Sequence, residues 1–201
     1  MTDSEDEYTV SIRITLPDAV NTILKKEKDR FVVEYGSSYK SEPHITLYLN
    51  RYTKEGFPKL IEDLKELSLS PFSFTLLDPI MSPGYRNSYN VDVSNKTALE
   101  KIHLAIESVA SKYQSKLLRK KDQERLERGI SPNSIKWVPH ITLGEVIVAA
   151  PQPDLNDIKN NIQEIIGQEV LVSDFTVFFY VKKTGAEKAE SLAEVTISFI
   201  I

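Results

Sequence analysis

The pentapeptide PHITL occurs twice in this 201-residue chain, at residues 43–47 and 139–143. Two of the three histidines, His44 and His140, occupy the same place in the two copies, 96 residues apart. A spacing of this length indicates a duplicated supersecondary unit rather than a short-period repeat array. No Gly/Ser-rich or Pro-rich linker separates the copies, so we expect a single bilobal domain with pseudo-twofold symmetry over residues 1–201.

Apolar periodicity and turn residues predict a similar order of elements around each copy. The predicted strands are 8–16, 44–50, 72–81, 87–94, 140–146, 169–183 and 193–201, and the predicted helices are 17–36, 54–70, 95–121 and 153–167. The acidic residues 1–7 are expected to be disordered. The first half therefore has the order βαβαββ, and the second half repeats it in outline.

Composition narrows the possible partners and chemistries. No apolar run approaches the roughly 20 residues of a membrane span, and the acidic start is unlike a signal peptide, so we expect a cytoplasmic protein. The absence of cysteine removes disulfides, thiolate nucleophiles and thiolate metal sites. A net charge of −4 argues against binding nucleic acid through a general basic field.

The alternation of a strand gives the repeated motif two different faces. In residues 44–50 the period of two places His44, Thr46 and Tyr48 on one face and the three apolar residues between and after them on the other. The second copy places His140 and Thr142 together in the same way. A histidine and a threonine on a solvent-facing side of a strand would explain one copy without any function. Two copies at corresponding places favour a functional His-x-Thr pair in each lobe.

Two histidines facing each other form an acid and base pair near neutral pH, because an unperturbed imidazole titrates at about 6.5. A threonine hydroxyl two residues further along the same face can donate a hydrogen bond to a non-bridging phosphate oxygen. The sequence therefore predicts a site for a phosphodiester, with His44 and His140 as catalytic residues and Thr46 and Thr142 as phosphate-binding residues.

Metal and serine-hydrolase chemistry fit the sequence less well. No His-x-His pair occurs, and only the single acids Glu42 and Glu145 lie close to the motifs, so two histidines would make an incomplete zinc site. The G-x-S-x-G motif of α/β-hydrolases is absent from the sequence. We therefore expect no metal.

Five further residues are possible substrate-binding residues, each with an equally ordinary structural explanation. Tyr48 could stack on a base or line the wall of the site. Tyr85, Arg86 and Tyr89 follow a Pro-Gly turn and could hold a nucleobase and phosphate, or form a surface turn. Trp137, three residues before a motif histidine, could line the site or anchor the core.

The third histidine and a basic cluster are interpreted as structural. His103 lies beside the apolar stripe of the longest predicted helix and has no threonine two residues further on. Lys116, Arg119, Lys120 and Lys121 at the end of that helix could guide an RNA tail, but a solvated helix end explains the same residues.

The paired HITL segments at 44–47 and 140–143 resemble the motifs of the two-histidine phosphoesterase superfamily, which includes bacterial 2′-5′ RNA ligase-like proteins and cyclic nucleotide phosphodiesterases of tRNA splicing. The resemblance extends over nearly the whole chain as an order of elements. It implies a bilobal α+β fold, with two pseudo-symmetric lobes whose antiparallel sheets form a concave cleft and whose helices lie outside. It also implies metal-independent chemistry in which His44 and His140 are the acid and base and Thr46 and Thr142 bind the phosphate.

From this resemblance we expect a hydrolase, without cofactor, that acts on 2′,3′-cyclic phosphate or 2′-5′ phosphodiester bonds of RNA ends or small nucleotides. A monomer without membrane segment or obligate protein partner is expected. Two alternatives stay open: a 2′-5′ RNA ligase using the reverse reaction, and a phosphate-binding module without turnover. The sequence leaves open which histidine is the base.

Overall fold

The computed structural model describes residues 7–39, 41–53, 55–84, 86–115, 123, 126–127, 136–181 and 190–199. The strands are β1 (Glu7–Thr15), β2 (His44–Thr53), β3 (Phe72–Ser82), β4 (Arg86–Val93), β5 (Ile141–Ile147), β6 (Glu169–Val172), β7 (Asp174–Val181) and β8 (Glu190–Ser198). The helices that are described from end to end are α1 (Asp18–Tyr35), α2 (Gly56–Lys65), α3 (Lys96–Ala110) and α5 (Leu155–Asn161), with short 3-10 turns η1 (Ser111–Tyr113) and η3 (Gln163–Ile165).

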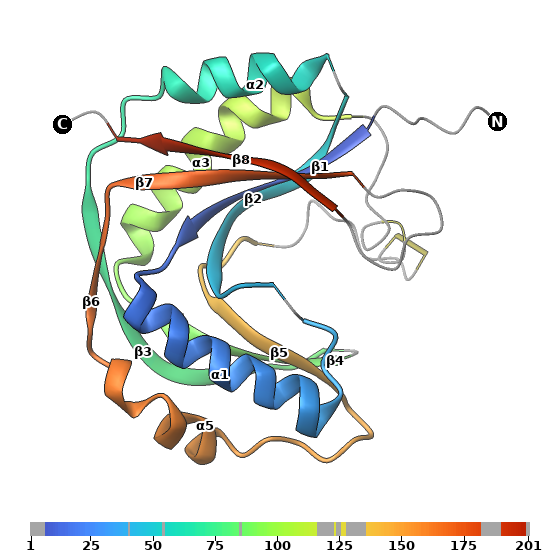
Figure 1. Cartoon of the computed structure of the whole chain (residues 1–201), viewed down its shortest axis with the longest axis vertical. Coiled ribbons are helices and arrows are strands. Elements are labelled where there is room, and N and C mark those ends of the chain that lie inside the picture. Colours follow the sequence, from blue (N-terminus) through green and yellow to red (C-terminus); the bar gives the residue numbers. More distant parts are fainter. Residues whose placement is uncertain are drawn as a thin grey trace.

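The strands form one eight-stranded antiparallel sheet in the order β6-β3-β4-β5-β2-β1-β7-β8. The sheet curls into a half-barrel, and its two central strands, β2 and β5, carry the repeated motif (Figure 1). These two strands are joined at one residue pair, Ile45 with Ile141. The expected α+β class is confirmed, and the expected sheets of the two lobes are halves of one continuous sheet.

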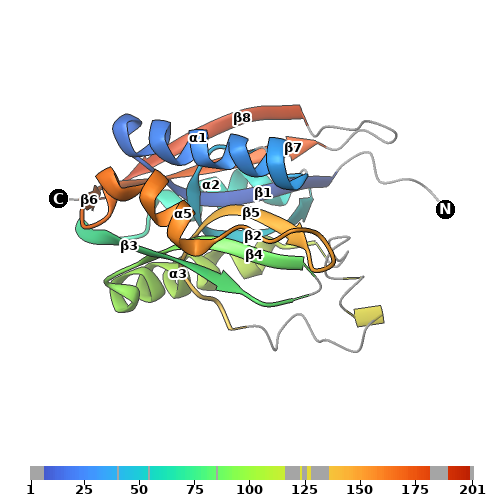
Figure 2. The same ribbon diagram turned by 90° about the horizontal axis from the view of Figure 1, so that it is seen from below.

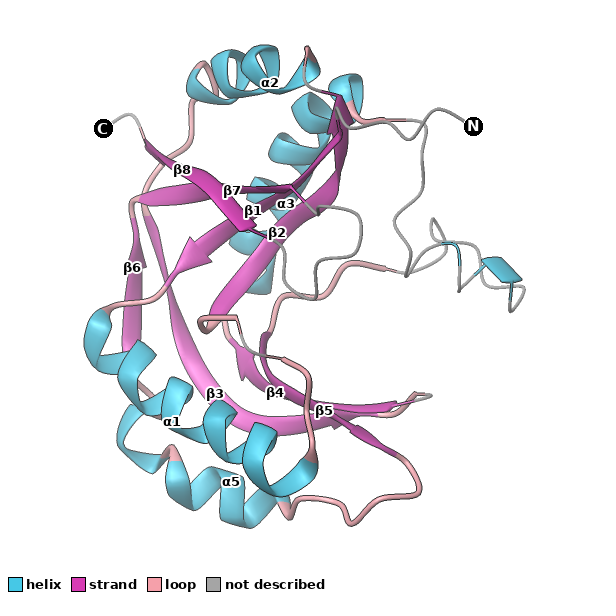
Figure 3. Ribbon diagram, turned by 45° about the vertical axis from the view of Figure 1, so that its right-hand side comes forward, coloured by secondary structure: helices cyan, strands magenta, loops and turns pink. Residues whose placement is uncertain are grey.

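The helices lie in two groups, one on each half of the sheet (Figure 3). Helices α2 and α3 pack together and on β2, whereas α1 packs on β5 and α5 packs on β3, with α1 and α5 side by side (Figure 2). The half of the sheet formed by β6, β3, β4 and β5 is therefore covered by α1, which follows β1 of the other half. The half formed by β2, β1, β7 and β8 is covered by α3, which follows β4 of the first. Of the described helices, none has the length and apolar character needed to cross a bilayer.

Local signals set both ends of α1. Pro17 precedes the helix with a φ of −55°, and Asp18 places a carboxylate in the first turn, near the positive end of the helix dipole. Gly36 ends the helix in the left-handed region with a φ of 66°. The amide of Ser37 then donates to the carbonyl of Phe31, which closes the last turn.

The predicted apolar stripe of the long helix is confirmed up to residue 110, but the helix ends earlier than expected. Leu99, Ile102, Ile106 and Val109 are all buried. The chain then leaves the helix through η1, and Gln114 is extended and bridges to Tyr52 of β2. This pairing with β2 replaces the next helical turn, so the predicted continuation toward residue 121 is wrong from this point, and residues 116–122 lie outside the described part.

Candidate active site

The two repeated motifs meet where β2 and β5 are joined. His44 is the first residue of β2, and His140 comes directly before β5. Ile45 and Ile141 pair with each other and are fully buried beneath the helices. Because strand side chains alternate, the histidine and threonine on either side of each isoleucine project from the opposite face. We call this opposite face, which carries both His-x-Thr pairs, the site face.

Antiparallel pairing brings the motifs together crosswise. With Ile45 opposite Ile141 and the strands running in opposite directions, His44 and Thr142 lie on one side of this pair, and Thr46 and His140 lie on the other. The charge of His140 lowers the pKa of His44, so the two imidazoles lie within electrostatic reach of each other. The structure thus brings all four residues of the duplicated motif to one place.

Each imidazole is fixed by a hydrogen bond to the backbone two residues earlier. His44 Nδ1 lies 2.6 Å from the carbonyl oxygen of Glu42, and His140 Nδ1 lies 2.8 Å from that of Val138. A carbonyl oxygen can only accept, so each Nδ1 carries the hydrogen and each Nε2 is directed away from the backbone. The proline between the two partners in each motif keeps the residue before it extended, which helps to hold this local geometry.

The surroundings of His44 oppose its protonation. Burial, the charges of Arg13 and Lys28, and the charge of His140 lower its pKa to about 3, although the carbonyl hydrogen bond at Nδ1 acts in the opposite direction. The hydroxyl of Thr46 lies 3.1 Å from Nε2 and donates to it in the neutral ring. His44 is therefore neutral near pH 7, with the lone pair of Nε2 on the site face.

The backbone of each motif threonine is held by a side chain from another element. Lys28 of α1 donates from Nζ to the carbonyl of Thr142 at 2.9 Å, and Trp137 donates from Nε1 to the carbonyl of Thr46 at 3.0 Å. Lys28 is only 3% exposed, and burial lowers its pKa to about 8. These two contacts fix the strands at the point where β2 and β5 separate.

Trp137 connects β2 to α3. Its indole stacks on His103 of α3, with ring centroids 4.3 Å apart and an angle of 8° between the planes. His103 Nδ1 in turn lies 2.6 Å from the carbonyl of Leu47. The ring of Trp137 thus packs against α3, and its hydrogen bond to the carbonyl of Thr46 ties it to the first motif. The structural interpretation of His103 agrees with its bond to Leu47.

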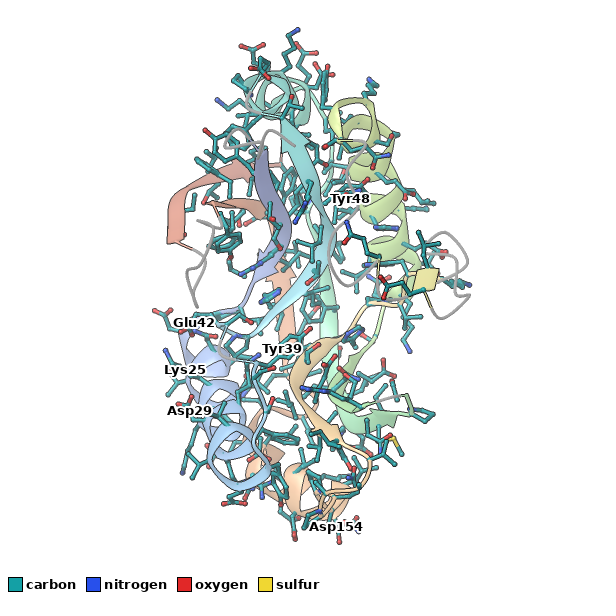
Figure 4. All side chains as sticks on the ribbon, turned by 90° about the vertical axis from the view of Figure 1, so that its right-hand side faces the viewer. Lys25, Asp29, Tyr39, Glu42, Tyr48 and Asp154 are labelled. Atoms are coloured by element: carbon teal, nitrogen blue, oxygen red, sulfur yellow. The ribbon has the colours of Figure 1, made fainter. Side chains whose placement is uncertain are left out.

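Tyr48 does not share the face of the first motif histidine, so that expectation is wrong. The pairing of β1 with β2 shifts between Ile12 and Arg13, a β-bulge that places Tyr48 rather than Leu47 opposite Ile12. A bulge reverses the alternation of the residues that follow it. The Tyr48 hydroxyl donates to Gln114 at 3.1 Å, and Tyr48 lies on the side of β2 that faces α3 (Figure 4).

The second motif has the same irregularity, and Tyr89 of β4 lies in the core. The pairing of β4 with β5 shifts between Tyr89 and Asn90, which puts Gly144 opposite Tyr89. Tyr89 is 3% exposed, its ring packs 5.4 Å from that of Phe31, and its hydroxyl donates to Gln152. Tyr89 is therefore placed among core residues, away from the site face, and the interpretation as a nucleobase contact is corrected.

The remaining candidates lie away from the motifs or outside the described part. Arg86 is exposed at the start of β4. Asn90 of the same strand lies opposite Thr142. Arg86 precedes Asn90 by four residues, so these two residues are about 13 Å apart along β4. Tyr85 and the basic residues Lys116 and 119–121 are outside the residues that the structure describes.

Sequence reasoning missed Arg13 and Lys28, whose charges both reach His44. Arg13 occupies the polar position between two apolar residues of the first strand, as an ordinary solvent-facing residue would. Lys28 belongs to the charged run at residues 25–30, typical of an exposed helix face. Only the strand register and the helix packing, both long-range properties, reveal that these side chains turn toward the motifs.

No group of three or more His, Asp or Glu side chains that could hold a metal ion occurs among the described residues. The charged side chains that act on the His44 ring are instead cations. The arrangement of two imidazoles, two hydroxyls and two nearby cations is suited to an anion.

Solved structures of similar fold cover nearly the whole chain. TT0787 of Thermus thermophilus matches with a TM-score of 0.63 and 16% identity, over 95% of this chain and 98% of that chain. LigT of E. coli without ligand matches with a TM-score of 0.61 and 14% identity, over 96% and 99%. LigT complexed with 3′-AMP matches with a TM-score of 0.59 and 16% identity, over 96% and 98%. These likenesses establish the shared fold.

A search of curated proteins gave no significant match. A family model does match: that of the 2′-5′ RNA ligase superfamily, over residues 25–183, a range that contains both motifs. The resemblance to two-histidine phosphoesterases that the motifs indicated is therefore confirmed. The chain belongs to the 2′-5′ RNA ligase superfamily.

Proposed function

We propose that this protein is a phosphodiesterase that opens 2′,3′-cyclic phosphates or cleaves 2′-5′ phosphodiester bonds in RNA ends or small nucleotides. One observation carries the proposal: His44 and His140 each have Nδ1 bonded to a backbone carbonyl and Nε2 directed away from it, on one face of the sheet. E. coli LigT, which shares the fold, has been solved with 3′-AMP and with phosphate, which supports a nucleotide-phosphate ligand here.

In the proposed reaction His44 is the base and His140 is the acid. His44 is neutral because its pKa is lowered, so its Nε2 is free of a proton and can accept one from a water molecule as the water oxygen bonds to phosphorus. The negative charge of a bound phosphate would raise the pKa of His44 and so strengthen it as a base. The bond from phosphorus to the 2′ or 3′ oxygen breaks, and that oxygen receives a proton from Nε2 of His140. The product is a phosphate monoester, and proton exchange with solvent restores both rings.

The two threonine hydroxyls bind the non-bridging oxygens in this proposal. Thr46 now donates to His44 Nε2, and it would turn its hydroxyl to the phosphate when substrate occupies the site. The carbonyls of Thr46 and Thr142 are held by Trp137 and Lys28, so little reorganisation of the backbone is needed.

We infer that the reaction uses no metal ion or cofactor. The chain supplies the acid, the base and the hydrogen-bond donors, and the cations near His44 would repel a divalent metal. Turnover in EDTA equal to that without EDTA is the expected result.

The proposal is tested with EDTA-treated protein, a panel of 2′,3′-cyclic nucleotides, 2′-5′-linked oligoadenylates and RNA ending in a cyclic phosphate, with products resolved by phosphorus NMR. We expect turnover in the wild type and a loss of about 10²–10⁴-fold in kcat in each of His44→Gln and His140→Gln, the range typical of general acid–base catalysis. Lys159→Gln, which changes a half-buried residue of α5 paired with Asp78, is the control and should retain wild-type turnover.

Other outcomes distinguish the alternatives. Joining of RNA ends with no net hydrolysis would replace the hydrolase with a 2′-5′ RNA ligase that uses the same histidines. Phosphate binding without turnover of any panel member, in protein whose NMR spectrum shows a folded chain, would contradict the enzyme proposal and leave a binding module.

A further inference from the structure

The two motif threonines face residues of different charge across their strand pairs. Arg13 of β1 lies opposite Thr46, and Asn90 of β4 lies opposite Thr142, each directly beside the β-bulge of its strand pair. Residues directly opposite in an antiparallel pair have Cβ atoms about 4.5–5.5 Å apart and project from the same face. The first half therefore places a cation beside its motif threonine, where the second half has a neutral amide.

The guanidinium of Arg13 is held in a defined place on the site face. It lies over the rings of two residues of β7, 4.7 Å from the centroid of Phe178 and 5.4 Å from that of Tyr180, and its Nε donates to Ser11 at 2.7 Å. The register puts Phe178 opposite Ser11, on the face that Arg13 shares. A stacked and bonded guanidinium has lost much of its rotamer freedom before any ligand arrives.

No carboxylate of the described part of the chain forms an ion pair with Arg13. Burial is the main influence on Arg13 and lowers its pKa, and the nearby Tyr180 hydroxyl acts in the opposite direction. Guanidinium has five N–H donors, of which the described residues engage those facing Ser11 and Tyr180. A partly buried cation whose donors the described residues do not all engage is stabilised by an anion.

Lys28 adds a second cation that repels the first. The charge of Arg13 lowers the pKa of Lys28, and both charges lower the pKa of His44. The carboxylate that acts most strongly on Lys28 is that of Glu42, which is engaged by Lys25 and Asn21. An anion at the motifs would relieve this repulsion.

We propose that Arg13 is a further phosphate-binding residue of the site: its guanidinium donates to a non-bridging oxygen of the substrate phosphate beside the Thr46 hydroxyl. The inference rests on the proposed function for its substrate class and deepens it. Opening a cyclic phosphate converts a singly charged diester into a monoester that can carry two charges, so the group that gains charge forms next to Arg13. Asn90 in the other half supplies no such charge.

The experiment measures the binding of inorganic phosphate to the full chain by NMR titration at pH 7, with His ring resonances as the readout. Arg13→Gln should weaken phosphate binding about tenfold or more, as expected for loss of a charge-assisted hydrogen bond, and Arg13→Lys should recover only part of it. Lys159→Gln removes one surface charge equally and should bind phosphate as the wild type does.

A second readout separates direct action from a general loss of structure. The charged groups facing His44 are Arg13 from β1, Lys28 from α1 and His140 before β5. The ring of His44 should therefore titrate at a higher pH in Arg13→Gln than in the wild type, which a purely structural role would not produce.

Phosphate affinity within twofold of the wild type in folded Arg13→Gln would overturn the inference, as would an unchanged titration of His44. Neither readout needs turnover. An absence of catalysis in the wild type would therefore count against the proposed enzyme and leave the role of Arg13 to be decided by phosphate binding.

Discussion

His44 links the chemistry of the site to the stability of the fold. Its folded-state pKa of about 3 lies below the roughly 6.5 of an exposed histidine, because the ring is buried beside Arg13 and Lys28. The unfolded chain therefore binds a proton at this residue more readily than the folded chain does. The stability that depends on neutral His44 is complete above about pH 6.5 and is lost progressively as the pH falls toward 3.

Replacing His44 with Gln should consequently reduce the pH dependence of stability. We expect the free energy of unfolding of the wild type to fall more steeply between pH 7 and pH 4.5 than that of His44→Gln, because the variant has no imidazole to protonate on unfolding. Urea denaturation followed by circular dichroism at several pH values measures both slopes. Parallel slopes would show that the ring is protonated as easily in the folded protein as in the unfolded chain.

The β-bulges after Thr46 and Thr142 explain why the motif strands could be predicted only in part. The alternation was correct for the histidine, isoleucine and threonine of each copy, since these precede the irregularity. It failed at Tyr48, because a bulge depends on the partner strand and leaves no mark in the sequence of its own strand. Arg13 was missed for the same reason: its opposition to Thr46 is a matter of long-range register.

Gly144 of β5 lies directly against Phe31 of α1. A Cβ atom built there would lie 2.5 Å from Cδ1 of Phe31, whose side chain is fully buried. We expect Gly144→Ala to destabilise the protein by about 1–3 kcal/mol through overpacking, as measured by urea denaturation.

A double-mutant cycle provides the control for this expectation. If the contact with Phe31 is the cause, Gly144→Ala should cost less in a Phe31→Leu background than in the wild type. Equal costs in the two backgrounds would assign the effect to the backbone of β5 instead.

The two halves of the molecule are interlocked through both helices and strands. Helix α1 covers the half built around β5, and α3 covers the half built around β2. Three of the strands that follow residue 136, namely β5, β6 and β7, each pair with a strand that precedes residue 94. The motif repeat predicted two related halves correctly in outline. It could not predict that α1 and α3 each pack on the other half of the sheet, because this depends on how helices dock after the strands pair.

Cutting the chain between residues 116 and 135 should therefore yield fragments that fold only together. Residues 136–201 alone would leave β5, β6 and β7 without their ladder partners, so we expect an NMR spectrum typical of an unfolded chain. Mixing with residues 1–115 should restore a dispersed spectrum. A dispersed spectrum from residues 136–201 alone would show that this part is an independent unit.

The single residue pair, or rung, that joins β2 and β5 also affects how the two halves of the sheet can move. Ile45 and Ile141 are held to each other, while the strands separate on both sides. A rotation of one half against the other about this rung would disturb no second pairing between these strands. Because the histidines and threonines adjoin the rung, a small swing would change the gap that a phosphate must fill. The junction of β2 and β5 would then act as a hinge, about which the two halves of the sheet change their distance from the phosphate without either half unfolding.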